Sequence, residues 1–257
     1  MIKQIPNLFT LLNLIFGCVA IILCLQPANI IVNDAIGEQA VELPEQMYLA
    51  SFCIIAAAVI DFFDGFIARL LKADSAMGKQ LDSLADVVSF GVAPSVIVYQ
   101  FLKNAFAQQQ NGLNVSFWLL LPAFFIAAAG AYRLARFNID NSQSIGFKGI
   151  PIPAAGLLIA SFPVISFYNQ SAFLQTVFTN VWFWYSTIAA VSYLMVSTLP
   201  MIALKFKQYS WKGNEPTYSL IILSVATIGI FKWLGIPIIF LMYVAISLLF
   251  KPKKNDV

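Results

Sequence analysis

Eight apolar stretches follow one another along this 257-residue chain, and most are long enough to cross a lipid bilayer as helices. They occupy residues 8–26, 47–69, 82–103, 117–138, 150–168, 181–204, 217–231 and 234–250. A spanning helix needs about 17–25 predominantly apolar residues, and it pairs its own backbone polar groups internally. The last two stretches are shorter and are separated by Lys232, Trp233 and Gly235, so we expect a tight helical hairpin there. The sequence therefore predicts an all-α, polytopic integral membrane helical bundle.

The composition supports this class of protein. Hydrophobic residues make up 60% of the chain and charged residues only 11%, whereas a soluble domain carries about 25% charged residues. The chain has no His, which excludes His-based triads and His-ligated zinc. Cys18, Cys24 and Cys53 lie in apolar runs without a pairing pattern, so we interpret them as small hydrophobic residues. A net charge of +3 gives no indication of a nucleic-acid partner.

The positions of the charges predict how the chain lies in the membrane. If eight segments span and the amino terminus is cytoplasmic, 13 of the 15 Lys and Arg residues are cytoplasmic and only Lys103 and Lys232 are external. The external 27–46 loop then carries four acidic residues and no Lys or Arg. This positive-inside pattern predicts a multi-pass protein of the cell (inner) membrane with both termini in the cytoplasm. We expect the first segment to be retained, because it is long for a signal peptide and no clear cleavage site follows it.

Four aspartates interrupt the apolar pattern near the cytoplasmic ends of the second and third segments. A charged side chain at the centre of a bilayer costs at least about 2.5–3.5 kcal/mol, so such residues indicate function. Asp61 and Asp64 are three positions apart, and Asp82 and Asp86 are four apart, so each pair shares a helix face. We expect the intervening 70–81 segment to be a short turn that brings the two helices together. Helix capping would explain one such aspartate, but not four at these spacings.

Four carboxylates that face one another repel unless protons or metal ions neutralise them. Oxygen ligands without Cys or His favour the hard ions Mg²⁺ or Mn²⁺. Four carboxylates can hold two such ions, and a two-ion site suits phosphoryl transfer because it can clamp a pyrophosphate. Gly65, Ala68 and Gly78 lie between the aspartates. Their small size is expected to permit close packing of the helices and close approach of a ligand.

The residues from Asp61 to Asp86 form the pattern D-x2-D-G-x2-A-R-x8-G-x3-D-x3-D. This pattern resembles the signature of the CDP-alcohol phosphotransferase family at all eight fixed positions. The probability that all eight match by chance at a given starting residue is on the order of 10⁻¹⁰. The resemblance covers residues 1–204, which correspond to the six-helix core of the family, and leaves 205–257 as a C-terminal hairpin with a basic tail. It also implies a homodimer.

The resemblance implies a reaction in which an alcohol attacks the outer phosphate of a CMP-linked lipid and CMP leaves. By motif position, Asp61, Asp64, Asp82 and Asp86 resemble the metal ligands, and Asp86 also resembles the general base. With no His in the chain, a carboxylate is also the natural base on chemical grounds. The implied contacts to CDP-diacylglycerol are Asn7, Thr10, Asp61, Gly65, Arg69 and Ser75.

Softer motifs at residues 7–13, 82–94, 132–138 and 147–153 resemble the branch of the family that uses L-serine as the acceptor. Arg133, Arg136 and Lys148 are candidates to bind the acceptor or a phosphate, because a guanidinium pairs well with both carboxylate and phosphate. The positive-inside rule also explains these three cations. Charge alone therefore leaves glycerol 3-phosphate open as the acceptor, and inositol is a further same-family alternative.

Two other classes of membrane protein also use intramembrane aspartates. A cation-coupled transporter is expected to show internal repeats and carboxylates near the membrane midplane, and an intramembrane prenyltransferase would show two separate Asp-rich motifs. This chain shows no repeat, and one such motif lies near one interface. We therefore expect an enzyme that transfers the phosphatidyl group from CDP-diacylglycerol to L-serine among membrane lipids, with no nucleic-acid partner.

Overall fold

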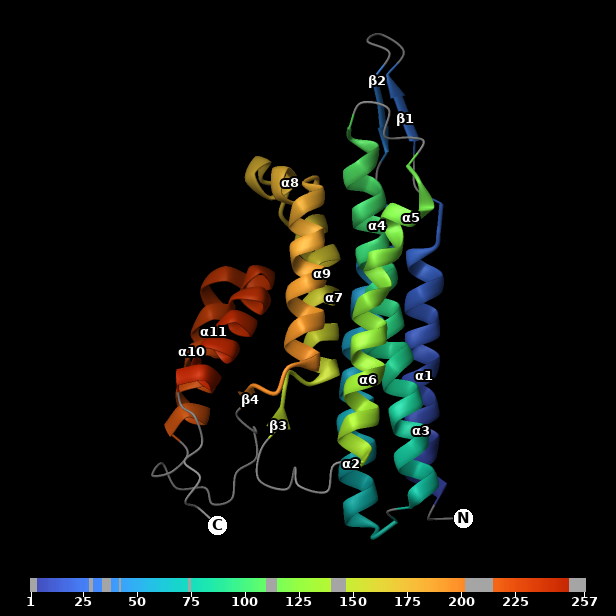
Figure 1. Cartoon of the computed structure of the whole chain (residues 1–257), viewed down its shortest axis with the longest axis vertical. Coiled ribbons are helices and arrows are strands. Elements are labelled where there is room, and N and C mark those ends of the chain that lie inside the picture. The colour runs from blue at the N-terminus through green and yellow to red at the C-terminus, as the bar shows by residue number, and fades with distance from the viewer. Residues whose placement is uncertain are drawn as a thin grey trace.

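The computed structural model describes residues 4–27, 30–33, 38–41, 43–73, 75–109, 115–139, 147–201 and 215–249 as a bundle of long helices (Figure 1). Two antiparallel ribbons, β1 (Ile30–Asn33) with β2 (Glu38–Val41) and β3 (Phe147–Lys148) with β4 (Pro200–Met201), complete it. The α-helices are α1 (Ile5–Cys24), α2 (Met47–Leu70), α3 (Ala76–Asp86), α4 (Ala93–Ala107), α5 (Phe117–Leu120), α6 (Phe125–Ile139), α7 (Ile152–Tyr168), α8 (Ala172–Phe178), α9 (Val181–Val196), α10 (Glu215–Phe231) and α11 (Gly235–Leu249). Shorter helical turns are η2 (Val87–Val92), η4 (Leu121–Phe124) and η5 (Lys232–Leu234).

Each of the eight predicted apolar segments is helical over most of its length. Among the described residues, five helical segments are long and apolar enough to cross a membrane: Ile5–Cys24, Met47–Leu70, Ala76–Ala107, Phe117–Ile139 and Thr217–Leu249. Ile152–Tyr168 and Val181–Val196 are shorter apolar helices. The last long segment bends at η5 into the side-by-side helices α10 and α11, which form the predicted hairpin (Figure 1). The chain is a multi-pass membrane protein.

Helix α1 places small and polar side chains inward and large hydrophobic side chains outward. Its buried residues are Pro6, Thr10, Asn13, Gly17, Ala20 and Cys24, and its exposed ones include Leu8, Leu12, Ile15, Val19 and Ile22. A water-soluble helix would show the reverse arrangement. In a bilayer, lipid tails solvate the large apolar side chains, and small residues let helices approach closely.

The third predicted segment is one continuous helical rod with an irregular centre. It comprises α3, the π-helical segment η2 and α4. Pro94 lacks a backbone N–H, which removes one helical hydrogen bond at this point. The backbone N–H of Ala93 bonds to Val88 O, and the Ser95 hydroxyl donates to Gly91 O at 2.8 Å. The π segment begins directly after Asp86, and π-bulges often lie at functional sites.

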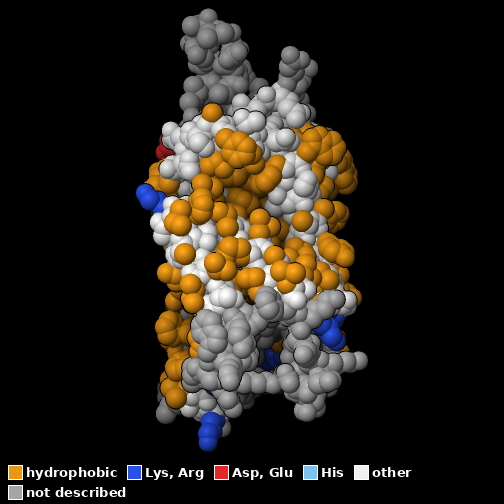
Figure 2. Space-filling model, turned by 90° about the vertical axis from the view of Figure 1, so that its left-hand side faces the viewer, with side chains coloured by type: hydrophobic (Ala, Val, Ile, Leu, Met, Phe, Trp, Pro, Cys, Tyr) orange, Lys and Arg blue, Asp and Glu red, His pale blue; other side chains and the backbone are white. Residues whose placement is uncertain are grey.

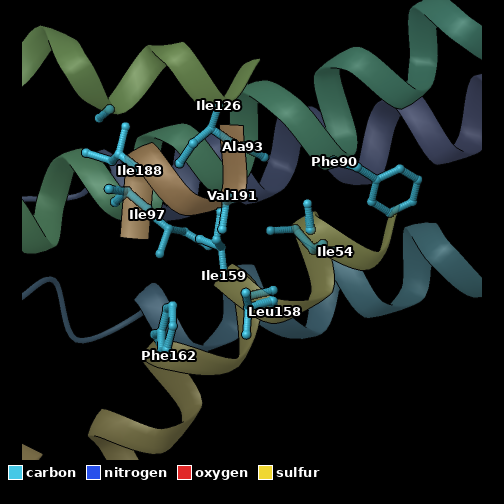
Figure 3. Packing of buried hydrophobic residues seen from close by; sticks show 14 of the residues in the cluster. Ile54, Phe90, Ala93, Ile97, Ile126, Leu158, Ile159, Phe162, Ile188 and Val191 are labelled. Carbon is cyan, nitrogen blue, oxygen red and sulfur yellow. The ribbon is translucent and has the colours of Figure 1, made fainter. Parts of the chain in front are cut away.

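Apolar side chains from α2, η2, α4, α6, α7 and α9 fill the middle of the bundle (Figure 3). Ile54, Ile97 and Ile159 are fully buried there. Gly156 of α7 meets the π segment closely, because a Cβ at this position would lie 3.0 Å from Cα of Phe90. The face that carries the hairpin shows hydrophobic side chains through its middle, and most of the visible Lys and Arg side chains lie below them (Figure 2).

Three parts of the chain differ from the prediction. The turn predicted at 70–81 is shorter, because α2 ends at Leu70 and α3 already begins at Ala76, capped by Ser75. The segment predicted at 181–204 leaves the helix after Val196, where the chain turns into β4 at Pro200. The ribbon β1–β2 and helix α8 lie in stretches that the sequence predicts as loops.

The segment that precedes α7 makes a close backbone contact with the end of α9. Gly149 has φ 73°, and a Cβ there would lie 2.6 Å from Met195 O and 2.8 Å from Ser197 O. Its N–H donates to Leu199 O at 2.9 Å, and β3 pairs with β4 beside it. Only glycine meets both requirements, a left-handed backbone and no side chain. This contact holds Lys148 at the same end of the bundle as the aspartates (Figure 1).

Candidate active site

Three of the four predicted aspartates form one cluster at the end of the bundle where α2 meets α3. Asp61 and Asp64 come from the last turns of α2, and Asp82 comes from the facing side of α3. One carboxylate oxygen from each of the three lies within 4.8 Å of the others. The spacing predicted from the sequence is therefore realised as a compact set of oxygen ligands.

Asp86 lies one turn further along the same helix and deeper in the bundle. It is 6% exposed, and its carboxyl group lies beside that of Asp61. The Asn13 side chain donates from Nδ2 to Asp86 Oδ1 at 3.4 Å. Asp86 thus borders the cluster, but it has its own partner from α1.

Thr10 of α1 orients Asp64. Its hydroxyl donates to Asp64 Oδ2 at 2.7 Å and also lies 3.2 Å from Pro6 O. Both side chains are buried. Thr10, an expected contact of CDP-diacylglycerol, also lines the cavity described next, so the same residue borders the ligand space and holds a carboxylate.

A cavity of about 590 Å³ opens beside the cluster. Five residues expected to contact CDP-diacylglycerol line it, and Asp61, the sixth, belongs to the adjoining cluster. Ala68 and Gly78, expected at close packing positions, line it too. The complete lining is Pro6, Asn7, Thr10, Asp64, Gly65, Ala68, Arg69, Ala73, Ser75, Ala76, Gly78, Lys79 and Asp82.

The two glycines of the motif have different surroundings. A Cβ at Gly65 would meet no atom within 4 Å, so this position leaves open space in the cavity. A Cβ at Gly78 would lie 3.0 Å from Ser75 Oγ and 3.1 Å from Asn7 Oδ1. Gly78 therefore permits close packing of α3 against α1, and Gly65 provides room for a ligand.

The first turn of α3 is held on two sides. The backbone N–H of Gly78 donates to Ser75 Oγ at 2.9 Å, which caps the helix. Lys79 Nζ donates to Asn138 O at 3.4 Å, and Asn138 Nδ2 donates to Ser83 Oγ at 2.8 Å. These bonds tie α3 to the end of α6, which fixes the cavity wall that carries Asp82.

The three predicted acceptor-binding cations lie in different environments. Arg133 is 6% exposed, lies within electrostatic reach of Asp86, and has no hydrogen-bond partner for Nε in the described part of the chain. Arg136 donates from Nη1 to Val196 O at 2.8 Å and from Nη2 to Ser197 O at 3.0 Å. Lys148 lies on β3 with an exposed side chain. None of the three lines the 590 Å³ cavity.

The donor set fits a divalent cation. The clustered ligand atoms are carboxylate oxygens from two helices, without Cys or His. Carboxylates at this separation repel one another, and a bound hard cation would remove that repulsion. Asp61, Asp64 and Asp82 would hold such an ion, and Asp86 is close enough to Asp61 to join them.

Comparison with known proteins agrees with this geometry. The sequence model of the CDP-alcohol phosphatidyltransferase family matches residues 3–182, which contain all four aspartates. The chain belongs to this family. It is therefore an enzyme that transfers a substituted phosphate group from a CDP-alcohol. The match ends within α9, before the C-terminal hairpin.

Several curated relatives are named for the synthesis of a serine phospholipid. A CDP-diacylglycerol–serine O-phosphatidyltransferase of Helicobacter pylori is 36% identical over 182 residues, which cover 70% of each chain. One of Bacillus subtilis is 35% identical over 157 residues, 61% of this chain and 76% of the relative. An archaetidylserine synthase of Methanothermobacter thermautotrophicus is 28% identical over 197 residues, 76% of this chain and 68% of the relative.

Asn13 and Lys79 are two residues at the site for which the sequence predicted no functional role. Asn13 is fully buried against Asp86, and Lys79 lines the cavity. A signal for Asn13 exists in the sequence, since Asn7, Thr10 and Asn13 recur every three residues in an apolar helix and share one face. Lys79 gave no such signal, because a cation in a cytoplasmic turn also satisfies the positive-inside rule.

Proposed function

We propose that this enzyme transfers the phosphatidyl group of CDP-diacylglycerol to the hydroxyl of L-serine, yielding phosphatidylserine and CMP. The observation that carries the proposal is the carboxylate cluster of Asp61, Asp64 and Asp82 beside a cavity that the family motif lines. The relatives named for this reaction support serine as the acceptor.

The cavity suits the CDP group. A volume of about 590 Å³ lies within the ~300–1,000 Å³ that small-molecule sites occupy. Arg69 and Lys79 are the cations of its lining and can pair with the pyrophosphate. Asn7 and Ser75 supply polar groups from α1 and from the α2–α3 turn, and Gly65 leaves the space that the ligand needs.

We assign Mg²⁺ or Mn²⁺ to the aspartates, with Asp61, Asp64, Asp82 and Asp86 as ligands for a two-ion site. When bound, the ions would polarise the pyrophosphate and neutralise charge that develops on the leaving CMP. The residues of the chain prepare this arrangement: Thr10 holds Asp64 through a 2.7 Å hydrogen bond. The backbone of α2 sets Asp61 and Asp64 on one face.

In the proposed reaction, Asp86 accepts the proton of the acceptor hydroxyl. The hydroxyl oxygen forms a bond to the lipid-side phosphorus, the bond from that phosphorus to the bridging oxygen breaks, and CMP leaves with the bonding electrons. Positioning and electrostatics supply most of the catalysis in such transfers. Asp86 suits the role because it is buried, borders the cluster and lies next to Asp61.

Arg133 is the preferred candidate for the serine carboxylate. It is buried near Asp86 and Nε has no partner among the described residues, whereas the Arg136 guanidinium already binds two carbonyl oxygens. A carboxylate held by Arg133 would bring the serine hydroxyl towards Asp86. Glycerol 3-phosphate would present a phosphate to the same guanidinium, and inositol would present no charge.

The test supplies purified enzyme with CDP-diacylglycerol, Mg²⁺ or Mn²⁺, and labelled L-serine, glycerol 3-phosphate or myo-inositol in parallel. We expect serine-dependent CMP release and labelled phosphatidylserine. Preferential incorporation of another alcohol would reject serine but keep the family reaction. Cation movement across liposomes without CMP release would reject the enzymatic proposal itself.

Metal binding has a test of its own that does not depend on turnover. Mg²⁺ or Mn²⁺ should raise the unfolding temperature of the detergent-solubilised protein, because the ion relieves repulsion among the carboxylates and binds only the folded state. Asp64→Ala should abolish this shift. A shift that survives in Asp61→Ala, Asp64→Ala and Asp82→Ala alike would contradict the assignment.

A further inference from the structure

Asn13 is the most buried polar residue of α1, and its side chain contacts Asp86, the proposed base. It is 0% exposed and does not line the 590 Å³ cavity. Its Nδ2 donates to Asp86 Oδ1 at 3.4 Å, and its Oδ1 has no hydrogen-bond partner in the described part of the chain. A buried carbonyl without a partner lowers stability. Leu has the same branched shape, with methyl groups in place of the amide oxygen and nitrogen, and would avoid this loss, so the presence of an amide at this position needs another explanation.

The backbone around Asn13 is fixed independently of its side chain. Ser89, three residues after Asp86 in the π segment, donates from Oγ to the backbone carbonyl of Asn13 at 3.0 Å. Gly17 makes this contact possible, since a Cβ there would lie 2.8 Å from Ser89 Cα and would clash with Ser89 Oγ. The helix that carries Asp86 and the helix that carries Asn13 are therefore locked at this level, and the amide meets the carboxylate at a set position.

The chemistry of an amide suits this position. Asp86 lies within electrostatic reach of three carboxylates, Asp61, Asp64 and Asp82, and of the Arg133 guanidinium. A Lys or Arg at position 13 would pair with Asp86 and hold its charge. An amide N–H orients a carboxylate oxygen without adding charge, and its reversed orientation would set a carbonyl oxygen against that carboxylate.

We propose that Asn13 is a positioning residue that orients Asp86 for proton transfer, an inference that rests on the proposed role of Asp86 as the base. The N–H of Asn13 binds Oδ1 and so sets the orientation of the Asp86 carboxylate towards the acceptor hydroxyl. Asn13 does not line the cavity and carries no carboxylate, so in this proposal it acts through Asp86.

The main variant is Asn13→Leu, which removes the donor and the unpaired carbonyl together. We expect kcat to fall ~10–100-fold, the scale of a small misplacement of a catalytic group. KM for CDP-diacylglycerol and for the acceptor should change less than about threefold, since the side chain lies outside the binding cavity. The unfolding temperature should be equal or higher. A variant that unfolds at a clearly lower temperature would overturn the proposal, because Asn13 would then be structural.

The matched control is Asn104→Leu. Asn104 of α4 also has a buried Oδ1 without a partner in the described part of the chain, but α4 carries it to the opposite end of the bundle (Figure 1). This control should leave kcat and both KM values unchanged. A kcat loss equal to that of Asn13→Leu would show that loss of any buried amide slows the enzyme, and would overturn the proposal.

A double variant separates this inference from the proposed function. If Asn13 acts through Asp86, adding Asn13→Leu to Asp86→Asn should not lower kcat further. Independent, multiplicative losses would overturn the positioning role and leave the proposed base intact. Near-normal turnover of Asp86→Asn alone would instead reject the base, and CMP release with the preferred acceptor of the wild type measures all of these outcomes.

Discussion

At the residue scale, the four aspartates of the motif separate into two environments. One carboxylate oxygen from each of Asp61, Asp64 and Asp82 lies within 4.8 Å of the others, and Asp64 also accepts a hydrogen bond from the Thr10 hydroxyl. Asp86 lies one turn deeper and has a neutral amide as its hydrogen-bond partner. A shared ion needs convergent oxygens, whereas a base needs a lone pair directed at its substrate. We propose that Asp86 is the base as well as a metal ligand because, of the four, it has this second environment.

The first prediction is that Asp86→Asn removes turnover but not binding of CDP-diacylglycerol. An amide keeps an oxygen near Asp61 but cannot take a proton, so we expect kcat to fall ~10²–10⁴-fold, the usual contribution of a general base. Asp61→Ala or Asp82→Ala should instead weaken binding of metal and nucleotide together. Equilibrium binding of labelled CDP-diacylglycerol, measured beside CMP release, distinguishes the two. Normal turnover of Asp86→Asn across a range of metal concentrations would show that another group is the base.

The second prediction separates the two arginines of α6. Arg133→Ala should raise KM for serine about tenfold or more, following the ~1.5–3 kcal/mol of a charged hydrogen bond, and should change KM for CDP-diacylglycerol much less. Arg136→Ala should lower the unfolding temperature, since Val196 O and Ser197 O lose their donors. Steady-state kinetics and thermal unfolding of both variants provide the check. A serine-specific KM effect in Arg136→Ala with normal stability would reverse the assignment.

At the element scale, the site depends on how closely α1 approaches the third span. Gly17 on α1 faces Ser89, and Gly78 on α3 faces Asn7, so small residues bring the helices together at both levels. Between these levels lie Thr10 and Asn13, the two α1 side chains that hold Asp64 and Asp86. Helix α1 therefore serves as the scaffold for two carboxylates that it does not itself carry.

The third prediction contrasts two glycines. Gly17→Ala should destabilise the protein by about 1–3 kcal/mol, the usual effect of overpacking, because its Cβ would lie 2.8 Å from the Ser89 backbone. Gly65→Ala should leave the unfolding temperature unchanged but weaken binding of CDP-diacylglycerol, since its methyl group enters the cavity. Gly229→Ala, with nothing within 4 Å, is the neutral control. Equal stability of the Gly17 and Gly229 variants would show that α1 is not held at this contact.

At the scale of the whole molecule, the polar site and most cations of the described residues lie at one end of the bundle. Arg69, Lys79, Arg136 and Lys148 belong to the end that carries the aspartates, and Lys103 lies on α4 towards the other end (Figure 1). The charge pattern of the sequence predicts that the site end is cytoplasmic. Water-soluble serine would then reach the cavity from the cytoplasm, and the lipid tails of CDP-diacylglycerol would stay in the bilayer.

The fourth prediction tests that orientation. Reporter fusions at residues 36, 110 and 175 should report an external location, and fusions at 75, 143, 210 and 257 a cytoplasmic one. The physical reason is the strong bias of Lys and Arg towards one set of loops. An external carboxyl terminus would contradict the final hairpin, although the site at the α2–α3 turn would keep its place.

The homodimer remains a proposal from the family resemblance. Light scattering of the detergent-solubilised enzyme, with the detergent contribution subtracted, should give about twice the mass of one chain. A single-chain mass over a range of protein concentrations would reject a stable dimer.

The sequence by itself determined the membrane class, the positions of the helices and the carboxylate motif. Membrane-spanning helices can be recognised in the sequence because crossing a bilayer requires about twenty consecutive apolar residues. Four aspartates within such apolar runs are unusual and therefore indicate a site. The predicted site residues on α2 and α3 meet because the motif lies on two helices joined by a short turn, so local periodicity sets their geometry.

Only the tertiary structure decided how helices far apart in sequence divide the work. It placed Asn13 against Asp86, across 73 residues, and Thr10 against Asp64, across 54. It turned Arg136 towards the end of α9 and left Arg133 buried near the proposed base, although both occupy one motif and carry the same charge. Periodicity reports which face of a helix a residue occupies, but the partner on that face depends on packing between helices, which no single stretch of sequence contains.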